Sequence, residues 1–232
     1  MSSENRIKYY AFFDVDGTVI TLNSLMSFLR YYYESTAPLR AVGTVKFMLA
    51  KGRLYVYRRY MGKNRNFLNR LYYKFFKNQP AVKIRECAKE WFSELDHKHK
   101  GLYRKGVVEQ LHKHQAKGAE IVFVSGSFPD CLQPLADKFN VKHILATTIE
   151  QQKGVYTGNI LPPQTIGDGK RVAMEKFLQI KNDSQASDCY AYGDHVSDIP
   201  MLAVVGNSVV IAGDSSLTAH AINNGWQIME NT

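Results

Sequence analysis

Three short apolar runs, at residues 9–13, 121–124 and 189–192, constrain the fold of this chain more than any other feature. None of them alternates apolar and polar residues, which is typical of strands buried on both faces of a parallel sheet. Helical patterns lie between the runs, as the crossover connections of a parallel sheet require. The sequence therefore predicts an α/β fold with a Rossmann-like parallel-sheet core.

Further elements are expected around these strands. A strand is predicted at residues 208–213, followed by a short helix that ends at Gly225. Residues 143–160 resemble a hairpin, with a turn near residues 152–154. Helices are predicted at residues 129–139, 170–178 and 200–205.

The middle of the chain differs from the rest in its composition and in the spacing of its apolar residues. Residues 21–115 hold nine of the fourteen tyrosines and long stretches with apolar residues at helical spacing. We interpret this segment as a bundle of about four helices inserted into the sheet domain. The predicted organisation is a core domain of residues 1–20 and 116–232 and an α-helical cap domain of residues 21–115.

Polar residues follow the predicted strands at the points where these strands end. Ligands of open parallel α/β sheets bind beyond the carboxyl ends of the strands, so these side chains are expected to converge. The residues concerned are Asp14 and Asp16 after the first strand, Ser125 and Gly126 after the second, Asp194 and Asp198 after the third, and Lys170 at a helix start.

Four aspartates in one place need a neutralising partner, because like charges raise one another's pKa. A hard divalent cation with oxygen ligands is the simplest partner, and Mg²⁺ suits a site that also takes a phosphate oxygen. Lys170 supplies a point charge for phosphate, Ser125 a hydroxyl, and Gly126 a backbone N–H that an anion can approach closely. The set predicts a Mg²⁺ site that binds a phosphoryl group.

The order of four motifs resembles the haloacid dehalogenase-like (HAD) superfamily, in its phosphoserine-phosphatase-like branch (subfamily IB). The first motif is DVDGT, which begins at Asp14, and the second is FVSGS, which contains Ser125. The third is Lys170 in GDGKR, and the fourth runs from Gly193 to Asp198 as GDHVSD. The resemblance covers the whole predicted core domain, residues 1–20 and 116–232. For the inserted segment, residues 21–115, it covers only the location and the helical character.

This resemblance implies a Mg²⁺-dependent phosphomonoester hydrolase that acts on a small phosphorylated metabolite. Asp14 would attack phosphorus and form an aspartyl-phosphate, and Asp16 would act as the general acid and base. The metal would be held by Asp14, the Asp16 carbonyl and Asp194, with support from Asp198 through water. Ser125 and Lys170 would bind the phosphoryl oxygens.

Two positions differ from the pattern of phosphoserine phosphatases. Asn23 stands where those enzymes carry a glutamate for the substrate ammonium, and Ser197 replaces an asparagine of the fourth motif. Both are candidate substrate residues, and the substrate is not necessarily phosphoserine. The alternatives are a phosphatase of a phospholipid head group such as phosphatidylglycerophosphate, a phosphotransferase or mutase with the same nucleophile, and a non-catalytic anion-binding protein.

The positive charge of the chain is concentrated in the cap. Residues 21–118 contain 21 Lys and Arg against 6 Asp and Glu, whereas the net charge of the whole chain is +9. This surplus indicates a substrate with extra negative charge, a weak contact with an anionic membrane, or a solvated face, and all three remain open. No nucleic-acid partner is expected, and the sequence does not indicate an oligomeric state.

The chain is expected to be cytoplasmic. Its first ten residues, MSSENRIKYY, lack the apolar region of a secretory signal. The three cysteines are far apart and in no metal-ligand pattern, so they are expected to be free, buried thiols: Cys87, Cys131 and Cys189. The histidines of the cap and of the segment after it are expected at the surface: His97, His99, His112 and His114.

Overall fold

The computed structural model describes residues 9–60 and 65–231 of the chain. Its elements, in chain order, are β1 (Tyr10–Asp14), α1 (Ser24–Thr36), α2 (Arg40–Tyr60), α3 (Arg65–Tyr73), the 3₁₀ helix η1 (Lys74–Phe76), α4 (Ala81–Lys98), α5 (Lys105–Ala116), β2 (Glu120–Ser125), α6 (Pro129–Lys138), β3 (His143–Ala146), β4 (Thr148–Gln152), β5 (Val155–Leu161), α7 (Asp168–Lys181), η2 (Ala186–Asp188), β6 (Tyr190–Gly193), η3 (Val196–Asp198), α8 (Ile199–Leu202), β7 (Asn207–Ile211), α9 (Ser215–Asn223) and β8 (Gln227–Met229).

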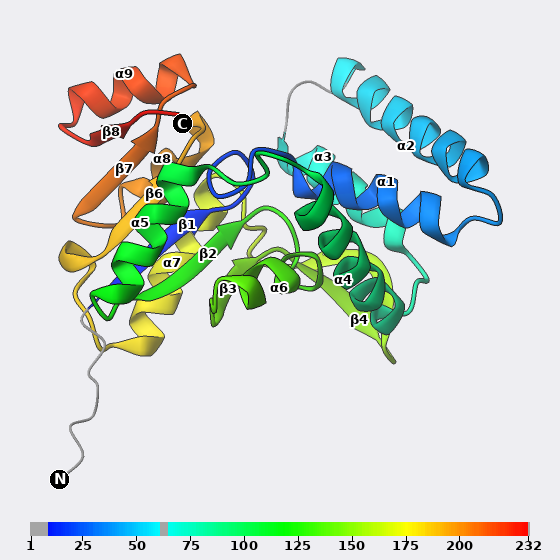
Figure 1. Cartoon of the computed structure of the whole chain (residues 1–232), viewed down its shortest axis with the longest axis horizontal. Coiled ribbons are helices and arrows are strands. Elements are labelled where there is room, and N and C mark those ends of the chain that lie inside the picture. The colour runs from blue at the N-terminus through cyan, green and yellow to red at the C-terminus, as the bar shows by residue number, and fades with distance from the viewer. Residues whose placement is uncertain (1–8, 61–64, 232) are drawn as a thin grey trace, which may run out of the picture.

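A parallel sheet in the order β3-β2-β1-β6-β7-β8 forms the centre of the molecule (Figure 1). In the register of the sheet, Asp14 pairs with Val124 of β2, and Phe13 pairs with Tyr192 of β6. The chain winds outward from β1 to β3 and then returns to β6 on the other side of β1. The boundary between β1 and β6 is therefore the topological switch point, where ligands of such sheets bind. The predicted Rossmann-like core is confirmed.

Both faces of the sheet are covered by helices, which explains why the strands do not alternate. Ala11 and Phe13 pack on the face that carries α5 and α6, and Tyr10 and Phe12 pack on the face that carries α7, α8 and α9. All four side chains are fully buried. A strand with two buried faces gains from apolar residues at every position.

The predicted hairpin is partly wrong. Residues 143–146 form β3, which pairs in parallel with β2 in the main sheet, so the hairpin consists of β4 and β5 alone. The two segments separate at Thr147, whose backbone N–H donates to the Ser127 carbonyl instead of continuing a strand. The remaining predicted strands and helices are present, and the short edge strand β8 was not predicted.

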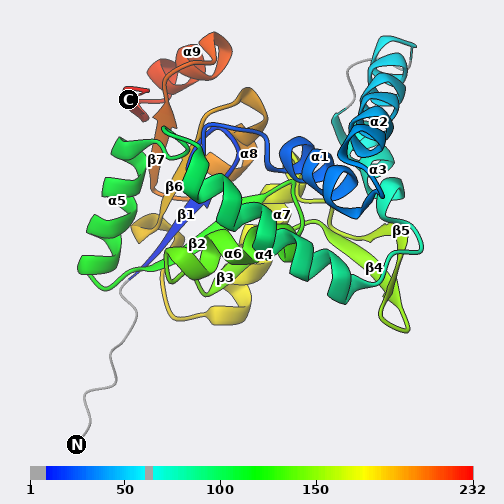
Figure 2. The same ribbon diagram turned by 45° about the vertical axis from the view of Figure 1, so that its right-hand side comes forward.

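Helices α1 to α3 lie together beyond the carboxyl ends of the strands, and α4 runs from them alongside α6; these four helices form the helical cap (Figure 2). Helix α5 also falls within residues 21–115, the range predicted for the cap, but it packs against β2. It therefore lies with the sheet, and the helices over the site end with α4 at Lys98.

The cap and the sheet domain share one apolar core. Phe128, at the start of α6, lies 5.8 Å from the ring of Phe28 and 5.5 Å from that of Phe76, measured between centroids. The β4–β5 hairpin is also joined to the cap, because Ala81 N–H donates to the Gly154 carbonyl and Tyr156 N–H donates to the Gln79 carbonyl. The cap is therefore joined to the rest of the structure both by the shared apolar core and by the hydrogen bonds to the hairpin.

The three cysteines are free and buried, as expected. His97, His99 and His112 are exposed, but the expectation for His114 is wrong. Its side chain is only 5% exposed, since it lies on the face of α5 that packs against the sheet. Its ring nitrogens lie 2.9 Å from the Tyr9 hydroxyl and 2.7 Å from the Tyr192 hydroxyl. Within the described residues, no helix combines the length and the apolar character needed to cross a bilayer.

Candidate active site

The site begins where β1 ends at Asp14, whose side chain is buried. The chain then turns sharply, because the Val15 carbonyl accepts hydrogen bonds from the backbone N–H groups of Val19 and Ile20. Gly17 is required in this turn for two reasons. Its φ is +86°, and a Cβ atom there would lie 2.2 Å from an Asp194 carboxylate oxygen.

Three of the predicted aspartates meet at the switch point. Asp14, Asp194 and Asp198 each offer a carboxylate oxygen, and these oxygens lie within 4.8 Å of one another. Lys170, from the first turn of α7, reaches the same place, with Nζ 2.6 Å from an Asp14 oxygen and 2.8 Å from an Asp198 oxygen. Lys170 is 5% exposed and Asp198 1%, so these ion pairs are formed almost without water.

Hydrogen bonds fix the orientation of the two later aspartates. The Thr18 hydroxyl donates to Asp194 Oδ1 over 2.9 Å. The His195 backbone N–H donates to Asp198 Oδ2 over 3.2 Å, and the other oxygen of Asp198 faces Lys170. Thr18 was not predicted as a site residue, although it stands in the first motif.

The pKa values of these groups reflect burial and crowding. Burial raises the pKa of Asp14 well above its ordinary value, although the charge of Lys170 opposes this. The pKa of Asp194 is also raised, by burial first and then by the charge of Asp198. Burial lowers the pKa of Lys170, but the charges of Asp14 and Asp198 more than reverse this, so the lysine stays protonated. The site thus sets one ammonium group against three carboxyl groups, and the raised pKa values of Asp14 and Asp194 show that ionising all three together is unfavourable.

Asp16 lies two residues beyond Asp14, at the entry to the cap. Its Oδ1 accepts a hydrogen bond of 3.1 Å from the backbone N–H of Ser24, the first residue of α1. Burial raises its pKa to about 6, and the contact with Ser24 limits the rise. A carboxyl group with this pKa can hold and release a proton near neutral pH, as general acid–base catalysis requires.

The donors present fit Mg²⁺. The cluster offers only carboxylate oxygens, the ligand type that hard divalent cations prefer, and its excess negative charge would be relieved by a cation. Asp14, Asp194 and Asp198 are the residues whose carboxylate oxygens could hold such an ion. These residues come from strand ends and a short 3₁₀ helix, so the donors are held by rigid elements.

The second motif forms the loop after β2. Ser125 is buried, and its hydroxyl oxygen accepts a hydrogen bond of 3.1 Å from the Ser127 N–H. The Gly126 carbonyl accepts hydrogen bonds from two cap side chains, Asn69 at 2.9 Å and Tyr73 at 2.6 Å. A Cβ atom at Gly126 would lie 2.7 Å from the Ile166 side chain, so glycine lets this loop pack closely.

Helix α3 also contacts the fourth motif. Arg65 Nη1 donates to the Ser197 hydroxyl and lies close to His195 Nδ1, both at 2.8 Å. Arg65 is exposed, so a cation stands at the edge of the site. Ser197 was predicted as a substrate residue, and the structure places it in contact with the cap.

The structure places Asn23, the other candidate substrate residue, at the start of α1. Its side chain is the N-cap of the helix, since Oδ1 accepts a hydrogen bond of 2.9 Å from the Met26 N–H. This contact satisfies one of the free N–H groups of the first helical turn. The Asn23 side chain thus caps α1, and the hydrogen bonds of the described residues do not join it directly to any of the four aspartates.

The cap residues that meet the site were not predicted from the sequence. Arg65, Asn69 and Tyr73 are spaced by four residues and lie on one face of α3. That spacing is visible in the sequence, but nothing local distinguishes this face from the others. Its partners are the loops at Gly126 and Ser197, which lie far along the chain.

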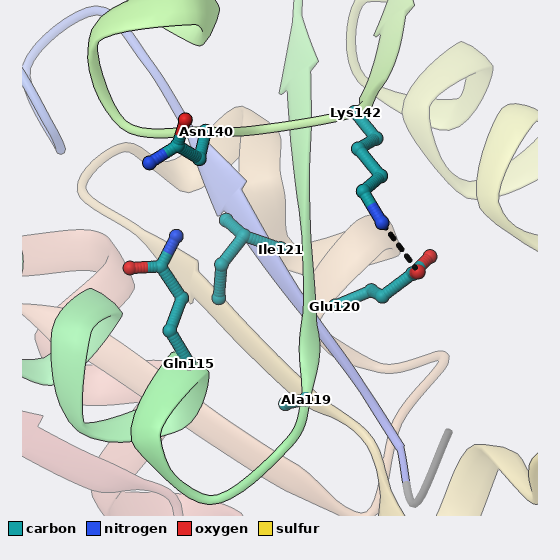
Figure 3. A pocket seen from close by; sticks show the side chains of 6 residues that line it. All are labelled: Gln115, Ala119, Glu120, Ile121, Asn140 and Lys142. Carbon is teal, nitrogen blue, oxygen red and sulfur yellow. Dashed lines mark ion pairs between the residues drawn. The ribbon is translucent and has the colours of Figure 1, made fainter. Parts of the chain in front are cut away.

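A hollow lies beside the amino end of β2, at the end of the strands opposite to the candidate site (Figure 3). It lies at the start of β2, whereas the candidate site lies beyond the end of that strand. Lys142 and Glu120 form an ion pair of 3.6 Å on its rim. The hollow is therefore not part of the candidate active site. It is lined by Gln115, Ala119, Glu120, Ile121, Asn140 and Lys142.

Comparison with known proteins identifies the family. Residues 11–203 match the family model described as haloacid dehalogenase-like hydrolase. The chain belongs to this family. The resemblance inferred from the four motifs is thus confirmed, and the matched range includes all of them.

Two of the relatives that this HAD chain matches are named as phosphatases. A Mycobacterium tuberculosis protein named "Probable phosphatase" is 32% identical over 116 residues, which are 50% of this chain and 40% of the relative. A Neisseria meningitidis protein named histidinol-phosphatase is 26% identical over 51% of this chain and 55% of its own length. The match thus spans less than half of the first of these relatives.

Solved structures share the fold over nearly the whole chain. A Bordetella pertussis protein of unknown function has a TM-score of 0.80 and 22% identity, and the match covers 97% of this chain and 100% of that one. A phospho-aspartyl intermediate analogue of phosphoserine phosphatase has a TM-score of 0.65 and 18% identity, with 97% and 94% covered. This chain therefore shares its fold with both of these solved structures.

Proposed function

We propose that the protein is a Mg²⁺-dependent phosphomonoester hydrolase that acts on a small phosphorylated metabolite through an aspartyl-phosphate on Asp14. The observation that carries this proposal is the arrangement at the end of β1. Asp14 is paired with Lys170 at 2.6 Å and lies beside two further carboxylates. Asp16, two residues on, has a pKa of about 6.

In the first step, the phosphoryl group of the substrate binds at the ends of β1 and β2. Lys170, the Ser125 hydroxyl and the Gly126 N–H orient its oxygens. A bound Mg²⁺ would offset the negative charge shared by the phosphoryl group and the carboxylates. An Asp14 oxygen attacks phosphorus, the bond from phosphorus to the substrate oxygen breaks, and Asp16 gives its proton to the leaving alkoxide.

In the second step, the ionised Asp16 takes a proton from water, and the water oxygen attacks the phosphorus of the aspartyl-phosphate. The bond between Asp14 and phosphorus breaks, inorganic phosphate leaves, and Asp16 is again protonated. Both steps need a proton on the same carboxyl group in turn. A pKa of about 6 lets Asp16 act first as the acid and then as the base, because its protonated and ionised forms are both populated near neutral pH.

The position of Asn23 as the cap of α1 supports a substrate other than phosphoserine. It supplies no carboxylate for an ammonium group, and its amide oxygen is already engaged with the Met26 N–H. Arg65 instead places a cation beside Ser197, at the edge of the site. A substrate with a second anionic group would match this charge.

The test is a screen for phosphate release over sugar, amino-acid, nucleotide and glycerolipid phosphates, with Mg²⁺ and with EDTA. Mg²⁺-dependent release that is abolished in Asp14→Asn and retained in Asp188→Asn supports the proposal. Asp188 is exposed and lies in η2, outside the aspartate cluster. Full turnover by Asp14→Asn would show that the nucleophile is wrong, and transfer to an added alcohol in place of release would indicate a phosphotransferase.

A further inference from the structure

Helix α2 stands at the outer side of the cap. In both ribbon views it lies beyond α1, on the side away from the sheet (Figures 1 and 2). Its packed face consists of Gly43, Phe47 and Ala50, at spacings of four and three residues. A Cβ atom at Gly43 would lie 2.2 Å from the Tyr33 carbonyl oxygen, so α2 packs very closely on α1.

The opposite face of α2 is apolar and open to solvent. With 3.6 residues per turn, residues 41, 45, 48, 49, 52, 56 and 59 fall on the side away from the packed face, so this face is apolar except for Arg59 near its C-terminal end. The large side chains there are strongly exposed: Val45 58%, Met48 57%, Leu49 70% and Val56 50%. A contiguous apolar stripe of this kind on a soluble domain marks an interaction surface.

Basic residues line both borders of this stripe. Lys46 and Arg53 project along one border, and Lys51 and Arg58 along the other, as the helical angle of 100° per residue places them. The helix contains six Lys and Arg and no Asp or Glu. The surrounding sequence continues the pattern, with 13 Lys and Arg and no acidic residue in 35–85.

The charge decides between two occupants of this surface. A second copy of the chain, packed α2 against α2, would bring two rows of cations together without an acid between them. An anionic bilayer would meet every one of these cations with an opposite charge and would take the apolar stripe into its acyl boundary. We propose that α2 is a docking surface for anionic phospholipid bilayers, with the helix axis parallel to the membrane plane.

The packing of α2 suits this role. The close contact at Gly43 holds the helix on α1, so its outer face is presented as a preformed surface. Lys and Arg on the borders can extend their side chains to phosphate groups while the stripe is immersed. The proposal stands on α2 alone and does not depend on the phosphatase function, because none of these residues belongs to the candidate active site.

The experiment is sedimentation of the full chain with vesicles of phosphatidylcholine alone or with 30% phosphatidylglycerol. We expect binding to the anionic vesicles only, with a weaker affinity as salt is raised from 50 mM to 500 mM. The triple variant Lys46→Gln/Lys51→Gln/Arg53→Gln should bind roughly 100-fold more weakly. A control triple on exposed positions outside residues 35–85, Lys89→Gln/Lys100→Gln/Lys113→Gln, carries the same change of net charge and should bind like the parent.

The apolar stripe needs its own test. Val45→Ser/Leu49→Ser should weaken vesicle binding more than roughly tenfold, since each side chain loses its contact with the acyl boundary. The matched control, Ile180→Ser/Ile222→Ser, removes two equally exposed apolar side chains from the sheet domain and should bind like the parent. Circular dichroism and phosphatase turnover check that all variants are folded.

Three outcomes would overturn the proposal. One is equal binding to neutral and anionic vesicles, and another is equal loss in the α2 and control triples, which would show a general charge effect. The third is no vesicle binding together with a concentration-dependent dimer in sedimentation equilibrium that Val45→Ser/Leu49→Ser abolishes, because the occupant would then be a second copy. Phosphate release measured on the same samples keeps these outcomes separate from failure of the proposed enzyme function.

Discussion

Replacement of Lys170 by methionine is the sharpest test of the electrostatics of the site. The ammonium group pairs with two buried carboxylates, at 2.6 Å from Asp14 and 2.8 Å from Asp198. Methionine keeps most of the volume of the side chain but removes the charge. Loss of one partner from a buried ion pair costs about 3–5 kcal/mol, because the remaining charge has neither water nor a counterion. We therefore expect Lys170→Met to lower the free energy of unfolding by this amount at pH 7 in EDTA.

The loss should depend on pH, and its sign follows from linkage. In the variant, the pKa of Asp14 rises further above its ordinary value of 3.8, because the cation that opposed the effect of burial is gone. Between the unfolded and folded pKa values the folded state binds more protons, so stability is present at low pH and is lost as pH rises through the folded pKa. The deficit should therefore be largest at pH 7 and should shrink towards pH 4.5.

The assay is urea unfolding followed by circular dichroism at both pH values. Lys176→Met, an exposed change on the same helix, is the matched control and should shift stability by less than about 0.5 kcal/mol. A deficit below about 1 kcal/mol at pH 7, or an equal deficit at both pH values, would refute the reasoning. Either result would mean that the carboxylates are compensated in some other way.

Further predictions concern Thr18, Asp16 and His114. Thr18→Val should weaken activation by Mg²⁺ roughly tenfold, because Asp194 loses its 2.9 Å hydrogen bond, and Thr18→Ser, which keeps the hydroxyl, should retain normal activation. Equal Mg²⁺ titrations of phosphatase activity for the two variants would argue against this positioning role. Asp16→Asn should slow formation of the aspartyl-phosphate from alkyl phosphates by roughly 10²–10⁴-fold and from p-nitrophenyl phosphate much less, as the better leaving group needs no proton, whereas the later hydrolysis step should be slowed for both substrates. An equal loss on both substrates in the single-turnover rate of leaving-group release would exclude Asp16 as the general acid. Burial lowers the pKa of His114 to about 4, so the unfolded chain binds the extra proton first, and about 3 kcal/mol of stability should be lost as pH falls from 6.5 to 4. His114→Gln should flatten this part of the profile of unfolding free energy against pH, and an unchanged slope would contradict the assignment.

The strand ends were predictable because their signal is local. A buried apolar run followed by a carboxylate already shows that the acid lies at the edge of a sheet, and parallel pairing then places Asp14 beside the other strand ends. Lys170 could be added for the same reason, since it opens a helix behind a glycine. These residues form the centre of the site, and only their mutual distances had to come from the structure.

The parts that were missed depend on pairings distant in sequence. Whether residues 143–146 pair with β2 or with the next strand depends on what lies beside them in space, and both choices fit a short apolar run. His114 stands between polar neighbours in the sequence, and its burial follows from the direction in which α5 packs. The side chains of α3 meet loops more than fifty residues away, for which helical spacing contains no information.

The backbone hydrogen bonds between residues 78–81 of the cap and 154–156 of the hairpin bear on how this protein could be recombined with its relatives. An exchange of residues 21–98 alone would leave Gly154 and Tyr156 of the hairpin facing the backbone of a foreign segment at positions 81 and 79. The set of residues that must be exchanged together is therefore discontinuous, and it consists of the helical segment together with β4 and β5. Chimaeras that exchange only residues 21–98 should fold poorly. Those that also exchange residues 148–161 should keep the packing of the cap against the hairpin.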